Sequence, residues 1–358
     1  MRPIVKIGAG IIALAMISLL FLNPSGCTSD TPDRRPLAKP KQCFIRSESG
    51  SIQSGQPIRF RSGIKVEKTV LDSTVTLDGI PVMEEEIPTD ELLLGRHDLK
   101  IRYLFDDSTR CESSWSIEIL SDVTPQVMQY QVISMYDHNT DAYTQGLTWH
   151  DGRIYESTGQ HGESLIYNYD PMKRDYADRV DLPMTYFGEG LTILGDRIYQ
   201  LTYKSKLGFY YDLNTMEKLG EFSLPTAEGW GLTDNGRELI ISDGTHVLTV
   251  LDPKTFEVLR TIPVYDDKQR LESINEMEYV DGYIYANLYG ATVIAKIDAS
   301  SGKVLEYIDC RGILPPELQT PDQDVFNGIA YNSERRTFYV TGKYWPKLFE
   351  VSFVPRPS

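Results

Sequence analysis

The stretch EGLTILGDRIYQLT, residues 189–202, joins two short strand patterns through a tight turn, and related stretches recur along the chain. They are QGLTWHDGRIYEST, WGLTDNGRELIISD, NEMEYVDGYIYANL and NGIAYNSERRTFYVT, which begin at residues 145, 230, 275 and 327. Turn pairs such as Asp151-Gly152 and Asn235-Gly236 favour hairpins. Each copy therefore predicts two neighbouring antiparallel strands joined by a tight turn.

A second marker follows every copy in phase. A strand pattern ends in an acidic residue 22 to 25 residues after each start, at Asp170, Asp212, Asp252, Asp298 and Glu350. A repeat of this length that consists of strands and turns, without a helix pattern, is typical of one blade of a β-propeller. Five copies fill residues 128–353. The sequence thus predicts an all-β fold whose main domain is a five-bladed β-propeller.

Residues 42–121 have a different pattern, with short alternating strand segments separated by Gly, Asp and Ser turns. This pattern predicts a small antiparallel, immunoglobulin-like β-sandwich with Trp115 in its core. Cys43 and Cys111 bracket the segment, so we expect them to form a disulfide, with Cys310 as a buried free thiol.

The amino terminus indicates export. Arg2 and Lys6 precede an apolar run over residues 7–22, so residues 1–26 are predicted to be a signal peptide. Gly26-Cys27 resembles the end of a bacterial lipobox, and both acylation of Cys27 and simple cleavage stay open. Residues 27–41 are polar and rich in proline, as in a flexible tether. We therefore expect a periplasmic protein or a membrane-anchored lipoprotein of a bacterial envelope.

The charge of the chain limits its partners. The 358 residues carry a formal net charge of -15, which argues against a nucleic-acid groove, because such a groove needs a basic stripe. The five histidines show no spacing of metal ligands, so neither a metal nor another cofactor is expected. We expect a monomer.

The propeller prediction places particular side chains together. The innermost strands of a propeller line its central channel, so equivalent positions of the repeats lie at the same height. The first residues of the repeats form one ring: Gln145, Glu189, Trp230, Asn275 and Asn327. A second ring follows after one hairpin: Gly159, Tyr203, Gly244, Tyr289 and Lys343. A carboxylate buried between two glycines should have a raised pKa unless Lys343 compensates it, and Glu189 is therefore a candidate proton carrier.

Several motifs carry a resemblance to a known family. YTQGLT, YFGEGLT, EGWGLT, INEMEY, YANLYG and VFNGIAY with YVTGKYWP resemble, in order and spacing, the glutamine cyclotransferases of the plant and bacterial type. The resemblance covers residues 128–353. It implies an acyltransferase that converts the amino-terminal Gln of peptides or proteins into pyroglutamate, releases ammonia and needs no metal.

The resemblance also implies roles for single residues. Glu189 takes the position of the family's general acid/base, and the substrate-binding positions fall on Gln145, Asn275, Lys343 and Trp230. Tyr143, Tyr203 and Tyr289 stand where the family often has Phe or Trp, and Asn327 completes the ring as a further substrate-binding candidate. Gln145, Asn275 and Lys343 can each donate a hydrogen bond to the γ-carbonyl oxygen, and the sequence leaves open which of them does.

Two other functions fit a propeller. One is a non-catalytic propeller of the cell envelope that binds peptides or glycans. The other is a calcium-dependent lactonase, which needs several convergent acidic ligands, whereas the inner ring offers a single carboxylate, Glu189.

Overall fold

The computed structural model describes residues 42–84, 86–173 and 175–356, and the chain divides into units of residues 1–40 and 41–358. The predicted signal peptide, the tether and Cys27 lie outside the described residues. Within the described ranges every regular element is a strand except one short 3-10 helix, η1 (Pro316–Leu318). No helix in this part of the chain is long and apolar enough to cross a membrane.

The eight strands within residues 43–120 form two sheets, with the orders β1-β3-β6 and β2-β8-β7-β4-β5. The predicted antiparallel arrangement is wrong at one edge, because β2 pairs with β8 in parallel. The chain passes from one sheet to the other between β1 and β2, so these consecutive strands do not form a hairpin. The strands are β1 (Cys43–Ser47), β2 (Ser51–Gln53), β3 (Ile58–Ile64), β4 (Val70–Leu77), β5 (Ile80–Val82), β6 (Glu86–Ile87), β7 (Gly95–Phe105) and β8 (Arg110–Leu120).

The apolar faces of these two sheets enclose a core of their own. Buried and exposed residues alternate along β7, as expected for a strand with one face in the core. Cys43 in β1 and Cys111 in β8 form a disulfide between the two sheets, which confirms the predicted pair. Trp115 packs against the same cluster, although its side chain is half-buried. Cys310 is a buried free thiol, as predicted.

The disulfide closes a long loop, with 68 residues of sequence separation between its two cysteines. We expect the Cys43→Ser/Cys111→Ser variant to lose about 2–4 kcal/mol of unfolding free energy in this segment, because the unfolded chain regains entropy. Urea unfolding of both proteins measures the difference. The candidate site described below should keep its structure, because it lies in the repeats. An unchanged urea midpoint would contradict the prediction.

The first three repeats each form a four-stranded antiparallel sheet in sequence order. The predicted hairpins are confirmed at all five motif copies, as β10–β11, β14–β15, β18–β19, β22–β23 and β26–β27. The strands of these three sheets are β10 (Thr144–His150), β11 (Arg153–Thr158), β12 (Leu165–Asp170), β13 (Asp175–Asp181), β14 (Gly188–Leu194), β15 (Arg197–Thr202), β16 (Leu207–Asp212), β17 (Lys218–Ser223), β18 (Leu232–Asp234), β19 (Leu239–Ile241), β20 (Val247–Leu251) and β21 (Val258–Pro263).

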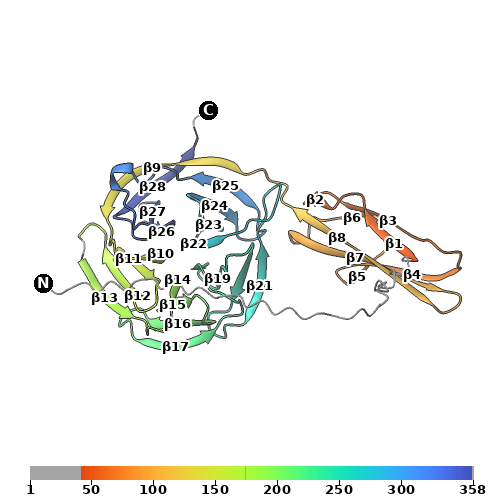
Figure 1. Cartoon of the computed structure of the whole chain (residues 1–358), viewed down its shortest axis with the longest axis horizontal. Helices are drawn as coiled ribbons and strands as arrows, with labels where there is room; N and C mark the ends of the chain where they lie inside the picture. Colours follow the sequence, from red (N-terminus) through yellow and green to blue (C-terminus); the bar gives the residue numbers. More distant parts are fainter. Residues whose placement is uncertain (1–41, 85, 174, 357–358) are drawn as a thin grey trace, which may run out of the picture. The chain divides into compact units, whose positions relative to one another are not determined.

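The last two repeats share one eight-stranded sheet with the order β22-β23-β24-β25-β9-β28-β27-β26. Strand β9 (Gln126–Asp137) precedes the first repeat, yet it pairs antiparallel with β28 and parallel with β25. This pairing joins the two ends of the repeat region and closes the ring of sheets in Figure 1. The other strands are β22 (Ile274–Val280), β23 (Tyr283–Leu288), β24 (Val293–Asp298), β25 (Val304–Asp309), β26 (Phe326–Asn332), β27 (Thr337–Gly342) and β28 (Lys347–Pro355).

The first strands of the five repeats contact one another in a closed cycle, from β10 through β14, β18, β22 and β26 back to β10. Close approach explains the glycine after Glu189: a Cβ on Gly190 would lie 2.5 Å from the backbone nitrogen of Leu232. Glu276 replaces this glycine in the fourth repeat. Its carboxylate accepts hydrogen bonds from the backbone N–H groups of Leu147 (3.1 Å) and Ile329 (2.7 Å), so it links three of the central strands.

The acidic marker has one structural role in four repeats and another in the fifth. In each of the four, a backbone N–H two residues further on donates to the carboxylate and caps the turn, at Asp170, Asp212, Asp252 and Asp298. The sequence predicts that Glu350 ends a strand, but in the structure it lies inside β28. It accepts hydrogen bonds from Thr337 and Tyr136. The outer strand beside β28 is β9, so no turn follows at Glu350 for it to cap.

Candidate active site

A cavity of about 300 Å³ lies where the first strands of the repeats begin. Its lining contains eight of the nine residues predicted to act on a substrate. The full lining is Tyr143, Gln145, Gln160, Phe187, Glu189, Tyr203, Trp230, Asn275, Tyr289 and Lys343. Seven of the ten residues in the two inferred rings therefore line one hollow.

Irregularities in the strands help to place the inner-ring side chains. The register of the first hairpin shifts at equivalent points in β10, β14, β22 and β26. Such bulges redirect side chains, and these contain Gln145, Glu189 and Asn275. The backbone of Glu189 is also fixed, because its carbonyl oxygen accepts a hydrogen bond from Ser157 Oγ (2.6 Å). Gln200 Nε2 donates to the same Ser157 hydroxyl (2.8 Å).

Asn327 is the predicted residue that the structure does not place in the cavity lining. It is fully buried, and its Nδ2 donates to the backbone oxygen of Thr144 (3.0 Å) in the neighbouring repeat. The position in the repeat therefore gave the height of Asn327 in the channel but not the direction of its side chain. In the structure this side chain ties the fifth repeat to the first.

Two buried ionisable residues line the same cavity: Glu189 is 4% exposed and Lys343 is 3% exposed. Burial raises the pKa of Glu189 well above its usual range, while the charge of Lys343 opposes that rise and Glu228 adds to it. Burial lowers the pKa of Lys343, and the carboxylates of Glu189 and Asp324 oppose that fall. The charge of each group therefore reduces the pKa shift that burial causes in the other.

Aromatic rings hold the ammonium group of Lys343. Its Nζ lies 4.4 Å from the centre of the Tyr143 ring and 5.5 Å from that of Tyr289. Cations are attracted to aromatic faces, and the attraction is stronger away from water. The Tyr143 hydroxyl donates to Asp324 Oδ2 (3.1 Å), which fixes one of these rings. These aromatic rings therefore fix the position of the Lys343 ammonium group, whereas a lysine side chain in solvent is flexible.

The indole of Trp230 forms another wall. Its ring centre lies 5.5 Å from that of Tyr289, and its Nε1 donates to Glu228 Oε2 (2.9 Å). Gly244 explains the space for this ring, because a Cβ there would lie 2.8 Å from the indole. Gly159, the other glycine of the second ring, leaves room for the Phe187 ring in the same way.

Two buried amide side chains, Gln145 and Asn275, also line the cavity, together with the half-buried Gln160. Gln145 is 4% exposed, and its Oε1 is buried without a hydrogen-bond partner among the described residues. Asn275 is 3% exposed, and its backbone oxygen accepts a hydrogen bond from Ser242 Oγ (2.8 Å). A buried acceptor without a partner is costly, so a ligand with an N–H donor would stabilise the site at Gln145.

The sequence did not reveal Gln160 and Phe187 as lining residues. Phe187 directly precedes the Gly188-Glu189 pair, and the glycine at position 159 was the signal that a large ring lies opposite. Gln160 has a φ of 83°, in the left-handed region that is uncommon for residues other than glycine. No local pattern in the sequence indicates that conformation.

The arrangement suits a small polar group that enters an aromatic enclosure. It offers one carboxyl group whose pKa is raised by burial, one ammonium group and three amides, Gln145, Gln160 and Asn275. Among the described residues, no group of three or more His, Cys, Asp or Glu side chains is arranged to hold a metal ion.

Comparisons with known proteins agree on one family. Residues 108–353 match the family model described as glutamine cyclotransferase. The chain is similar to a glutaminyl-peptide cyclotransferase from Arabidopsis thaliana, with 34% identity over 64% of this chain and 73% of the relative. It is also similar to the crystal structure of the Myxococcus xanthus glutaminyl cyclase, with 31% identity and a TM-score of 0.60 over 65% of this chain and all of that one.

Proposed function

Because the chain belongs to the glutamine cyclotransferase family and its activity is that of a glutaminyl-peptide cyclotransferase, we propose that the cavity around Glu189 is where the reaction occurs. The reaction would convert an amino-terminal glutamine residue into pyroglutamate and release ammonia. The observation that carries this proposal is the burial of Glu189 and Lys343 in one aromatic-walled cavity, together with the two buried amides of its lining.

Glu189 acts as the proton carrier in this proposal. The free α-amine of the substrate, with an ordinary pKa of about 7.7–8.0, is partly neutral at pH 7 and attacks the γ-amide carbon. A C–N bond forms, and the attacking nitrogen must lose a proton while the departing amide nitrogen must gain one. The Glu189 carboxylate can accept the proton that the attacking nitrogen loses. Because burial raises its pKa, it can then deliver that proton to the amide nitrogen, which leaves as ammonia when its bond to the γ-carbon breaks.

The other polar groups stabilise charge and hold the substrate. As the ring closes, the γ-carbonyl oxygen gains negative charge, and Lys343 and the amides of Gln145 and Asn275 are the donors that line the cavity. The unpartnered Oε1 of Gln145 is suited to accept an N–H of the substrate. Trp230, Phe187 and the tyrosines exclude water and restrict the glutamine side chain to conformations near ring closure. Every step is assigned to side chains, without a metal ion.

The proposal includes the architecture and location of the enzyme. We infer a five-bladed propeller over residues 128–353, in which β9 supplies the outer strand of the last blade, after an immunoglobulin-like sandwich over residues 42–121. From the predicted export signal we infer a monomer in a bacterial envelope, either free in the periplasm or attached through a lipid at Cys27. The disulfide supports export, because such bonds persist in oxidising compartments.

Ammonia release from the dipeptide Gln-Ala by the purified protein tests the proposed function. We expect steady release that a chelator does not slow, and none from the same peptide with an acetylated amino terminus, because the nucleophile is then blocked. If the folded protein released no ammonia, the cavity would serve binding rather than catalysis. A rate that collapses on chelation and returns with calcium would contradict the metal-independent mechanism.

A further inference from the structure

A second and larger hollow, of about 980 Å³, lies beside the cavity. Tyr344 lines this groove, and its ring centre is 5.1 Å from that of Tyr143, which lines the cavity. Two chain segments contribute to both hollows. Gln160 and Lys343 face the cavity, whereas Glu163 and Tyr344 line the groove. The two hollows are therefore neighbours that share a wall.

The size of the cavity makes the groove relevant to peptides. A volume of about 300 Å³ is at the lower end for small-molecule pockets, so the cavity encloses little more than the terminal residue. The α-amine of that residue must reach its own γ-amide inside the cavity. The rest of a peptide substrate must then leave through the opening, and the groove is the large hollow that borders it.

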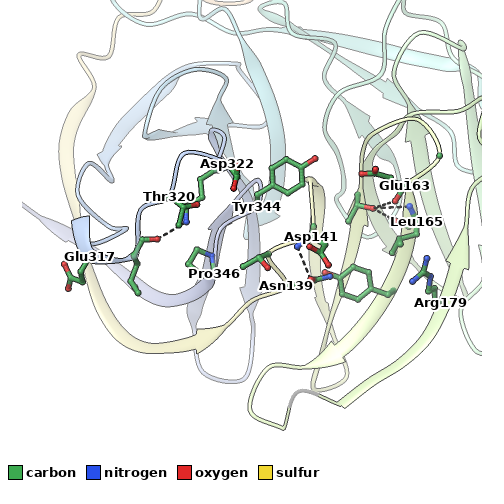
Figure 2. A pocket seen from close by; sticks show the side chains of 17 residues that line it. Asn139, Asp141, Glu163, Leu165, Arg179, Glu317, Thr320, Asp322, Tyr344 and Pro346 are labelled. Atoms are coloured by element: carbon green, nitrogen blue, oxygen red, sulfur yellow. Dashed lines mark hydrogen bonds between the residues drawn. The ribbon is translucent and has the colours of Figure 1, made fainter. Parts of the chain in front are cut away.

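The groove is acidic. Figure 2 shows Glu163 at one side and Glu317 at the other, with Asp322 and Asp141 near Tyr344 between them. Among the described residues, no ion pair joins these four exposed carboxylates to a basic side chain. The single basic residue of the lining, Arg179, donates to Asp181 (2.9 Å). Burial, and then the charges of Glu163, Asp324 and Asp141, raise the pKa of the Tyr344 hydroxyl.

We propose that this groove binds the residues after the amino-terminal glutamine and that its carboxylates select peptides with lysine or arginine at the second to fourth positions. This proposal rests on the proposed function, because the groove matters only if a glutamine terminus enters the cavity. The walls suit such side chains: Leu165, Leu318 and Pro346 contact the aliphatic stem while the carboxylates face the charged end.

The expected preference is moderate. Exposed ion pairs contribute little individually, so two basic residues should raise kcat/KM by about 3- to 10-fold over alanine. The gain should appear mainly in KM, because the groove holds parts of the peptide that do not react. It should shrink at high ionic strength, since salt screens exposed charges.

Ammonia release from three amidated peptides, Gln-Lys-Lys-Ala, Gln-Ala-Ala-Ala and Gln-Glu-Glu-Ala, tests the proposal. We expect kcat/KM to fall in that order. The ratio between the lysine and alanine peptides should approach 1 in the Asp141→Asn/Glu163→Gln/Asp322→Asn variant. The matched control, Asp151→Asn/Asp196→Asn/Asp281→Asn, changes the net charge by the same amount. Its three positions lie in the hairpin turns at the ends of β10, β14 and β22, outside the groove, so the ratio between the lysine and alanine peptides should stay unchanged.

The outcomes separate the two proposals. Equal kcat/KM for all three peptides, or a lysine preference that survives in the groove variant, overturns the groove proposal while ammonia release still supports the enzyme. Calorimetric measurement of the binding of the same peptides tests the groove if the protein releases no ammonia. An inactive protein that binds the lysine peptide more tightly, in a manner lost in the groove variant, would retain the groove and overturn the proposed function.

Discussion

Replacement of Glu189 by glutamine is expected to lower kcat/KM for Gln-Ala by about 10²- to 10⁴-fold, the usual contribution of a positioned proton carrier. Glutamine has nearly the same shape but cannot exchange a proton with the attacking and departing nitrogens. Substrate binding should persist, so the loss should appear in kcat rather than in KM. A variant that retained activity within about threefold would remove Glu189 from the mechanism.

The same substitution should stabilise the protein at neutral and alkaline pH. Because the folded state raises the pKa of Glu189, folding favours the protonated carboxyl, and stability falls as the pH rises from about 4.5, the unperturbed value, towards the folded pKa. Glutamine does not titrate and avoids this loss. The difference in Tm between the variant and the wild type should therefore increase with pH.

Glu278 provides a matched control for both effects. Burial also raises the pKa of Glu278, but this residue lies outside the cavity lining. In Glu278→Gln the side-chain oxygen can still accept the hydrogen bond of the Tyr331 N–H (3.0 Å). We expect a similar dependence of Tm on pH with activity close to that of the wild type. Equal losses of activity in the two variants would indicate a general perturbation of the channel.

The Lys343→Met variant is expected to lose about 10²- to 10³-fold in kcat, the range for a lost donor to a developing oxyanion. Its pH dependence should change as well. The ammonium lowers the pKa of Glu189, so without this charge the pKa rises further. The acid limb of the pH profile should therefore move to higher pH.

Lys343→Arg separates charge from shape in this test. Arginine keeps the positive charge, so the acid limb should stay near its wild-type position even if the larger guanidinium lowers kcat. If the limb stays in place in Lys343→Met, the charge of Lys343 does not control Glu189. If Lys343→Met keeps its full kcat, another donor stabilises the oxygen, and Asn275 becomes the next candidate.

Local patterns in the sequence determined much of this protein. Turn pairs such as Asp151-Gly152 specify hairpins through backbone preferences that act over a few residues, and all five hairpins form where predicted. The repeat then placed Glu189 and Asn275 at one height, because each copy builds the same strands. The pairing of Cys43 with Cys111 followed from a segment with its own strand pattern.

Tertiary structure alone decided what depends on contacts between distant residues. The pairing of β9 with β28 joins segments more than 200 residues apart, as in the Tyr136–Glu350 hydrogen bond, and no local pattern marks it. It also explains why Glu350 lies inside a strand. The direction of Asn327, the link that Glu276 makes across the channel, and the left-handed Gln160 are set by neighbouring strands and loops.

Tertiary structure also decides the protonation equilibria of the site. The sequence indicated that Glu189 and Lys343 would be near each other, but the pKa of each depends on how completely the assembled walls exclude water. The groove beside the cavity arises in the same way, because its carboxylates come from loops of different repeats. Backbone preferences are local and can be found in the sequence, whereas desolvation and the convergence of loops exist only in the folded chain.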